Sequence, residues 1–74
     1  MNATPLKTVI IVPTYNERDN ITALVHALQE QFKCIRHDMH ILVVDDNSPD
    51  RTADVVRDLQ ASHPNLHLLN GQKQ

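Results

Sequence analysis

The chain alternates between short apolar runs and longer segments in which apolar residues recur at helical spacing. The runs at 8–12, 40–45 and 66–69 are predicted to be strands, and the first two are rich in β-branched residues. Such continuous runs are typical of strands that are buried on both faces of a parallel sheet. The segments from 17 to 32 and from about 49 to just before Pro64 are predicted to be helices. The order therefore predicts an α/β fold, βαβαβ, with a three-stranded parallel sheet.

Each predicted helix carries one apolar stripe and a candidate N-terminal cap. Asn16 is predicted to cap the first helix and Ser48 the second, with Pro49 at the first helical position. Residues 1–6 are predicted to be a frayed lead-in, 33–39 a linker, and Asn70-Gly71 a turn. The predicted stripes consist of Ile21, Leu24, Val25, Leu28 and Phe32 in the first helix and of Thr52, Val55, Val56 and Leu59 in the second.

The first two predicted strands each run into a polar turn that bears carboxylates. The turn at 13–17 contains Tyr15 and Glu17, and the turn at 45–50 contains Asp45 and Asp46. The carboxyl ends of parallel strands share one edge, where open α/β folds bind their ligands. We therefore expect Tyr15, Glu17 and Asp46 to lie near one another at a nucleotide-binding crevice. No glycine-rich loop joins strand and helix, which argues against a dinucleotide fingerprint or a phosphate loop.

The residue types in these turns suit a nucleoside. The ring of Tyr15 can stack on a base, and the carboxylate of Glu17 can accept hydrogen bonds from ribose hydroxyls. Asp45 and Asp46 are adjacent on a strand end and point to opposite faces, so one faces the ligand and the other binds turn N–H groups. Asp, Asn, Ser and Pro are also ordinary turn residues, so a purely structural reading of each turn stays open. Under that reading Thr14 and Asn16 form turns, and Asp50 and Asp54 lie on the surface or cap a helix.

Composition narrows the classes of partner. The net charge of −2 and scattered Lys and Arg residues give no sign of a nucleic-acid surface. No apolar run reaches the roughly 18 residues of a membrane span, and the N-terminus lacks the core of a signal peptide. The single Cys34 fits a reducing compartment and is interpreted as a small buried residue rather than a nucleophile. The spacing of the five histidines predicts no metal site. We expect a cytoplasmic chain.

Two segments, 11–21 (IVPTYNERDNI) and 41–52 (ILVVDDNSPDRT), resemble the opening of family 2 glycosyltransferases. Within that family they are most similar to polyprenol (dolichol) phosphate mannosyltransferases. The resemblance implies a GT-A fold and transfer of a sugar from a nucleotide donor, GDP-mannose or similar, to a polyprenyl (dolichyl) phosphate. It also implies that the nucleotide pocket is lined by Pro13, Tyr15, Glu17, Val44 and Asp46.

The resemblance carries further expectations. The 74 residues are expected to be one partial domain, the N-terminal nucleotide-binding part of a GT-A domain, inactive alone. Mg²⁺ or Mn²⁺ is expected in the intact enzyme, held by an Asp-x-Asp motif that this chain lacks. An intact protein is expected to associate peripherally with the cytosolic face of a membrane through further parts. The family usually has glycine where Arg51 stands.

The family also implies that the three strands lie side by side in reverse chain order, with both helices on one face. The opposite, apolar face would then be bare, so the isolated chain is expected to be marginally stable and to self-associate. Two other readings stay open. The acidic run after residue 44 is similar to the opening of signalling receiver domains, although there the acidic strand comes first. The chain could also be a non-catalytic fragment.

Overall fold

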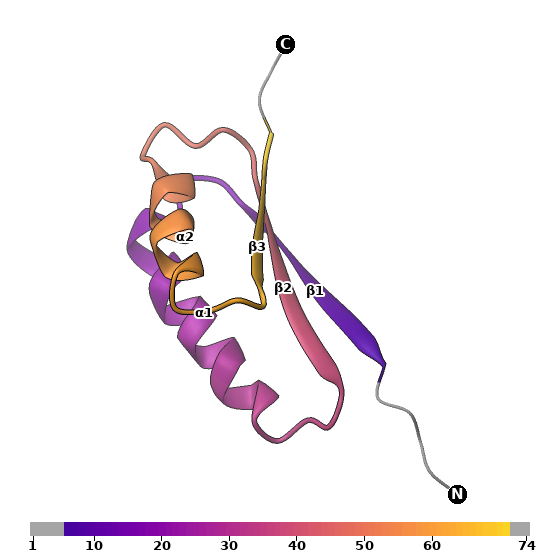
Figure 1. Cartoon of the computed structure of the whole chain (residues 1–74). Helices are drawn as coiled ribbons and strands as arrows, with labels where there is room; N and C mark the ends of the chain where they lie inside the picture. Colours follow the sequence, from indigo (N-terminus) through magenta and orange to yellow (C-terminus); the bar gives the residue numbers. More distant parts are fainter. Residues whose placement is uncertain (1–5, 72–74) are drawn as a thin grey trace, which may run out of the picture.

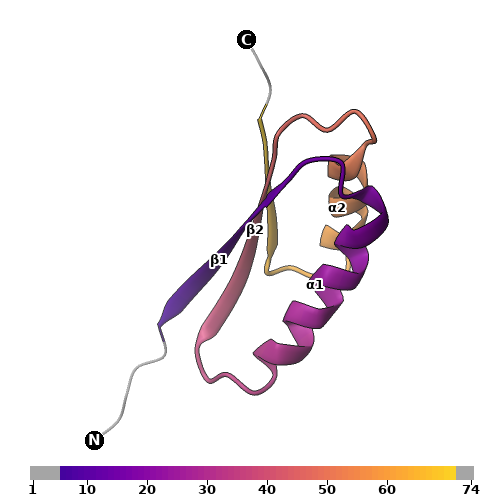
Figure 2. The ribbon, with the colours of Figure 1, turned by 180° about the vertical axis from the view of Figure 1, so that it is seen from behind.

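The computed structural model describes residues 6–71. Its elements follow one another as β1 (Lys7–Thr14), α1 (Arg18–Phe32), β2 (Asp38–Asp45), α2 (Thr52–Gln60) and β3 (Leu66–Asn70). In the sheet, β2 lies between β1 and β3, and both neighbours run parallel to it. Both helices lie on the same side of the sheet (Figure 1), and the view from behind agrees (Figure 2). The predicted α/β fold and strand order are confirmed.

The strands extend beyond the apolar runs that predicted them. β1 continues through Pro13 to Thr14, β2 begins two residues earlier than expected, at Asp38, and β3 includes Asn70. Proline is acceptable in β1 because β1 is an edge strand. The predicted turn at Asn70-Gly71 is wrong at its start, since the N–H of Gly71 still donates to the carbonyl of Asp45, at 2.7 Å.

The predicted frayed lead-in ends one residue too late. Leu6 is held to the linker before β2, because its N–H donates to His37 Nδ1 at 3.1 Å and its carbonyl accepts from Asp38 N–H at 2.9 Å. Residues 1–5 lie outside the described part of the chain. The linker itself is shorter than predicted and occupies residues 33–37.

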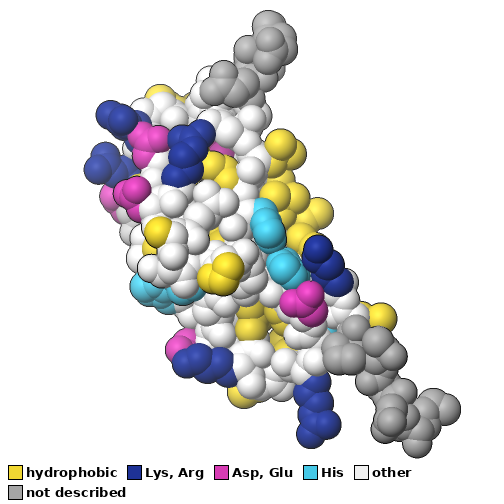
Figure 3. Space-filling model, in the orientation of Figure 1, with side chains coloured by type: hydrophobic (Ala, Val, Ile, Leu, Met, Phe, Trp, Pro, Cys, Tyr) yellow, Lys and Arg dark blue, Asp and Glu magenta, His cyan; other side chains and the backbone are white. Residues whose placement is uncertain are grey.

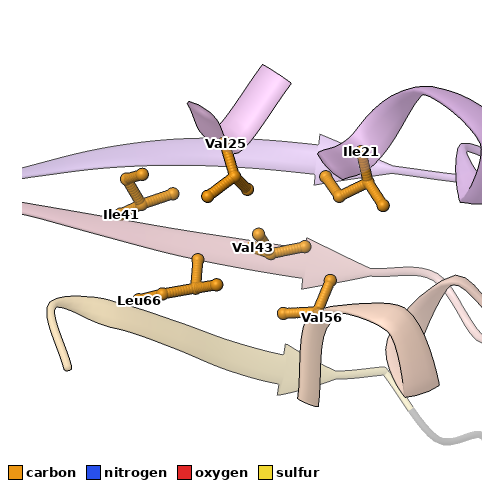
Figure 4. Close-up of a cluster of buried hydrophobic side chains, with 6 residues drawn as sticks. All are labelled: Ile21, Val25, Ile41, Val43, Val56 and Leu66. Atoms are coloured by element: carbon orange, nitrogen blue, oxygen red, sulfur yellow. The ribbon is translucent and has the colours of Figure 1, made fainter. Parts of the chain in front are cut away.

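The hydrophobic core lies between the helices and one face of the sheet (Figure 4). α1 contributes Ile21 and Val25, and α2 contributes Val56; these three side chains are at most 1% exposed. The sheet side of the cluster consists of Ile41, Val43 and Leu66. The predicted α1 stripe is correct except for Leu24, which is 39% exposed, because it lies off the line of positions 21, 25, 28 and 32 that faces the sheet. Burying this cluster is the main favourable term that holds the two layers together.

The sheet has one covered face and one open face. Residues that are partners in the parallel register have their side chains on the same face of the sheet. One of the two faces packs against the helices. On the open face, Val9, Ile11 and Leu69 are 45%, 63% and 56% exposed. The expectation of a bare apolar face is therefore confirmed, because no helix of residues 6–71 covers it, although continuous apolar runs are typical of strands that are buried on both faces. The open face comprises Val9, Ile11, Pro13, His40, Leu42, Val44, His67 and Leu69.

Both helices begin later than the cap residues predicted. α1 begins at Arg18, after Glu17 in the N-cap position, and neither helix has a side-chain cap from its own N-cap residue. Asn16 does not cap α1, because its backbone has φ of 55° and turns the chain before the helix. Ser48 and Pro49 lie in the loop before α2, which starts at Thr52. The caps predicted at Asn16 and Ser48, and Pro49 as a first helical residue, are therefore wrong.

Arg51 precedes α2 in the left-handed conformation, with φ of 69°. Left-handed backbone costs a residue with a Cβ roughly 1–2 kcal/mol, and glycine adopts it freely. Its side chain offsets little of this, because the Arg51 Nε–Asp54 Oδ2 ion pair of 2.7 Å is largely exposed. The position therefore stores strain that glycine would remove.

Replacing Arg51 with glycine is expected to raise the free energy of unfolding by about 1 kcal/mol. Denaturant melts of the two proteins measure this difference. Arg51→Ala is the matched control, since alanine loses the ion pair but keeps the Cβ. An equal gain in the alanine variant would show that relief of the backbone is not the cause.

Candidate functional site

The carboxyl ends of the three strands are joined by main-chain hydrogen bonds. Thr14 lies opposite Asp45 in the last pair of the β1–β2 ladder, and the N–H of Asp46 donates to the carbonyl of Thr14 at 3.1 Å. The N–H of Gly71 reaches the carbonyl of Asp45 from the β3 side. A Cβ at position 71 would lie 3.1 Å from that carbonyl oxygen, so glycine allows this close approach. Asp45 and Asp46 thus lie at the centre of a rigid edge.

Asp45 is a buried structural carboxylate, 1% exposed. Its Oδ1 accepts from the hydroxyls of Thr14 at 2.7 Å and Ser48 at 2.6 Å, and its Oδ2 accepts from Ser48 N–H at 3.0 Å. Burial by itself raises the pKa of Asp45, but the hydrogen bonds from Ser48 and Thr14 outweigh it and hold the pKa below its ordinary value. The carboxylate is therefore ionised and fully occupied within the protein.

The two polar turns are bound to each other through three successive backbone N–H groups. Those of Asn16, Glu17 and Arg18 donate to Ser48 Oγ at 2.9 Å, Thr52 Oγ1 at 3.1 Å and Asp50 Oδ2 at 3.1 Å, respectively. The first turns of helices have N–H groups without partners inside the helix. Side chains of the second turn thus satisfy the start of α1, and this fixes the two turns relative to one another.

Asp50 ties the starts of both helices together. Besides Arg18 N–H, it accepts from the hydroxyl and the N–H of Thr52, a side chain that is fully buried. The Thr52 hydroxyl bond is the main reason that the pKa of Asp50 lies below its ordinary value. The sequence reading of Asp50 as a capping residue is consistent with these bonds, but the link to the other turn was missed. The available signal was the spacing of Ser48, Asp50 and Thr52 at every second residue, which can direct three polar side chains to one side.

The remaining polar side chains of the two turns face outward. Tyr15 is 55% exposed, Asp46 is exposed and Glu17 is half-buried. None of the ion pairs found within residues 6–71 involves Glu17 or Asp46. Glu17 Oε1 accepts one weak hydrogen bond, from Asn20 Nδ2 at 3.3 Å. These two carboxylates are therefore available to accept hydrogen bonds from a ligand.

Pro13 and Val44 form a small apolar surface beside these groups. They are partners in the β1–β2 register and both lie on the open face of the sheet. Tyr15 and Asp46 directly follow the last ladder pair, one on each strand. The structure therefore brings Pro13 next to Val44 and sets Tyr15 and Asp46 at the ends of adjacent strands. Glu17 stands two residues beyond Tyr15, at the start of α1.

Comparison with known proteins identifies the family to which this chain belongs. The sequence profile of "Glycosyl transferase family 2" matches residues 9–74, which include both turns. The chain belongs to glycosyl transferase family 2. Its curated relatives include a dolichol-phosphate mannosyltransferase of Pyrococcus furiosus, 37% identical over 59 residues, which are 80% of this chain and 16% of the relative.

Two further relatives of the family 2 chain agree with this assignment. A polyprenol monophosphomannose synthase of Mycolicibacterium smegmatis is 37% identical over 65 residues, 86% of this chain and 23% of the relative. A putative glycosyltransferase, CsbB, of Bacillus subtilis is 38% identical over 53 residues, 72% of this chain and 16% of the relative. The aligned part of this chain thus spans less than a quarter of the length of these relatives. Membership of the family decides against the receiver-domain reading.

Other features of the family 2 chain lie away from the strand-end edge. A surface depression of about 460 Å³ lies between the end of α1 and His63. Cys34 is exposed rather than buried as predicted, because it lies in the turn that follows α1. Within residues 6–71, no three side chains of His, Cys, Asp or Glu are grouped as metal ligands. No helix in that range is long and apolar enough to cross a membrane.

Proposed function

We propose that this chain is the N-terminal nucleotide-binding part of a GT-A glycosyltransferase domain and that its strand-end edge binds the nucleotide of a sugar donor. The observation that carries the proposal is that the acidic side chains of the two turns fall into two pairs with different surroundings. Asp45 and Asp50 are occupied by hydrogen bonds inside the protein, whereas Glu17 and Asp46 have no cationic partner within residues 6–71. A structural turn would need the first pair only.

Each outward group has a role that suits its chemistry. The ring of Tyr15 stacks on the base, and Pro13 and Val44 supply apolar contact beside it. The carboxylate of Glu17 accepts hydrogen bonds from the ribose hydroxyls. Asp46 accepts from the N–H edge of the base, which favours guanine or uracil because an ionised carboxylate is an acceptor only.

The names of the relatives support the choice of donor and acceptor. A dolichol-phosphate mannosyltransferase and a polyprenol monophosphomannose synthase both point to mannose and to a polyprenyl phosphate. We therefore propose GDP-mannose or a similar nucleotide sugar as the donor and a polyprenyl (dolichyl) phosphate as the acceptor of the intact enzyme. A lipid acceptor would place that enzyme at the cytosolic face of a membrane.

Catalysis by the intact enzyme is expected to need Mg²⁺ or Mn²⁺ at the diphosphate of the donor. Such an ion stabilises the charge that develops on the leaving phosphate. This chain carries no Asp-x-Asp sequence, and we assign it the recognition of the nucleoside rather than the binding of that ion. We expect the 74-residue chain to transfer no sugar by itself.

Asp46→Asn is expected to weaken the binding of guanosine diphosphate by about 10–100-fold. A hydrogen bond to a charged group contributes roughly 1.5–3 kcal/mol, and an amide would present N–H groups where the base also donates. Isothermal titration calorimetry of the chain with guanosine diphosphate measures the effect.

The matched control is Asp58→Asn, an equal change of charge at an exposed position on α2. It is expected to leave the affinity unchanged. The same affinity in Asp46→Asn and in the unaltered protein would remove Asp46 from the site. Because Asp46 is exposed, its replacement should leave the melting curve of the ligand-free protein in place.

A further inference from the structure

Two histidines meet on the open face of the sheet, nearer the amino-terminal ends of β2 and β3 than the proposed nucleotide edge is. His40 lies near the start of β2, and His67 lies on the adjacent β3. His40 Nδ1 and His67 Nε2 are 3.0 Å apart, and the rings are stacked with their centroids 5.1 Å apart. Figure 3 shows histidine side chains beside hydrophobic ones on the strand side of the molecule. Neither residue has a part in the proposed nucleotide site.

The separation of these two nitrogens fits chelation of one metal ion. Imidazole nitrogens bind Zn²⁺ at about 2.0–2.1 Å, so two of them at angles between 90° and the tetrahedral angle lie about 2.8–3.4 Å apart. The observed 3.0 Å falls within this interval. Without an ion, the same distance is satisfied when one ring donates its N–H to the other. An ion would replace that shared proton and engage both lone pairs.

The second nitrogen of His40 lies beside a carboxylate. Asp38 Oδ1 is 3.1 Å from His40 Nε2, although the contact is not aligned as a hydrogen bond and Nε2 has no other partner within residues 6–71. A nearby carboxylate favours the proton on Nε2, which leaves the lone pair on Nδ1, the atom that faces His67. Carboxylates beside the outer nitrogen are usual for histidines that bind metal ions, because they fix the tautomer and increase the basicity of the ligand.

The surroundings hold the pair in place. The backbones of both histidines are held in the sheet, in which β2 pairs with β1 on one side and β3 on the other. Little backbone ordering is therefore needed when an ion binds. The side chain of His40 is only 16% exposed. In the register, His40 lies opposite Val9, and His67 lies opposite Leu42, so apolar residues flank the pair on the open face.

We propose that His40 and His67 form a two-histidine chelate for one divalent transition-metal ion, with water completing the coordination. Imidazole ligands favour Cu²⁺, Ni²⁺ and Zn²⁺, and of these three ions Cu²⁺ binds most tightly. Mg²⁺ instead prefers oxygen ligands. The two-histidine site therefore differs in its ligand chemistry from a site built for Mg²⁺. The proposal does not depend on the proposed function of the strand-end edge.

Calorimetric titration of the chain with CuCl₂, ZnCl₂ and MgCl₂ tests the site. We expect one Cu²⁺ or Zn²⁺ per chain and no Mg²⁺. His67→Gln and His40→Gln should each weaken binding by more than about tenfold, and Asp38→Asn by about tenfold. The control is a chain with both His26→Gln and His63→Gln, whose rings contact each other elsewhere, 5.6 Å between centroids; it should bind as the unaltered chain does.

Electron paramagnetic resonance of the Cu²⁺ form gives a second readout, in which two imidazole nitrogens should couple to the ion. His67 is exposed, so His67→Gln decides the question even if His40→Gln fails to fold. Absence of saturable Cu²⁺ and Zn²⁺ binding would overturn the proposal. Binding that survives His67→Gln but disappears in the His26/His63 control would overturn it as well.

Discussion

Replacing Asp45 with alanine is expected to lower the free energy of unfolding by about 3 kcal/mol. The change leaves Ser48 N–H and the hydroxyls of Ser48 and Thr14 without their acceptor, and each buried group of this kind costs about 1–3 kcal/mol. A chain of 74 residues typically has a total stability of only about 4–11 kcal/mol. Urea melts followed by circular dichroism measure the loss. Asp58→Ala, on the exposed side of α2, is the control and should change stability by less than about 0.5 kcal/mol.

The Asp45 carboxylate also makes the stability of the protein depend on pH in the acid range. Because the pKa of Asp45 is lower in the folded than in the unfolded chain, its stabilising contribution is fully present above the ordinary value of 3.8. That contribution is lost as the pH falls through the lower, folded pKa. The unaltered protein should therefore lose stability below about pH 4 more steeply than Asp45→Ala does. Equal slopes in the two proteins, or a small effect of Asp45→Ala at pH 7, would show that Asp45 does not join the turns.

The isolated chain is expected to self-associate through the open face of the sheet. Ile11, 63% exposed, and Val9 form an apolar surface on β1, whose outer edge has no strand partner within residues 6–71, and Leu69 on β3 adds an exposed apolar side chain to the same face. In a purified solution the only available occupant of this surface is a second copy. Burial of an isoleucine side chain contributes about 1.5–3 kcal/mol, so Ile11→Lys in both copies should weaken association by at least about tenfold.

Sedimentation velocity over a range of concentrations measures this association. Leu24→Lys is the control, because Leu24 is an exposed apolar residue of α1, the helix on the other side of the sheet from the open face. It should leave the sedimentation coefficients of the chain unchanged. A chain that stays monomeric at high concentration, with a sharp cooperative melt, would contradict the expectation.

The layers of the fold were predictable because they depend on long, redundant patterns. The four positions 21, 25, 28 and 32 all indicate the same buried face of a helix, so the prediction does not depend on any one of them. Each of the apolar runs at 8–12 and 41–44 predicts a strand independently of the other. The helix starts were not predictable in the same way. They depend on the left-handed backbone of Asn16, Asn47 and Arg51, which cap statistics do not reveal.

The candidate site was predictable in part. The sequence placed Tyr15, Glu17 and Asp46 at one sheet edge, and it left open which aspartate of the pair faces inward. The bonds of Asp45 answer that question, since its carboxylate is buried under Thr14 and Ser48. The three bonds between the turns join residues 32 to 35 positions apart, and no local pattern predicts such pairs. Likewise, His40 and His67 meet only because the register of β2 and β3 brings them together.

Titration of the isotope-labelled chain with guanosine diphosphate, followed by the amide chemical shifts of each residue, tests nucleotide binding at the strand-end edge most directly. The proposal predicts saturable changes that cluster at residues 13–17 and 44–46, with the amides of β1 and β2 far from that edge unaffected. Saturable changes centred elsewhere, or no saturable change at any concentration of the nucleotide, would contradict it.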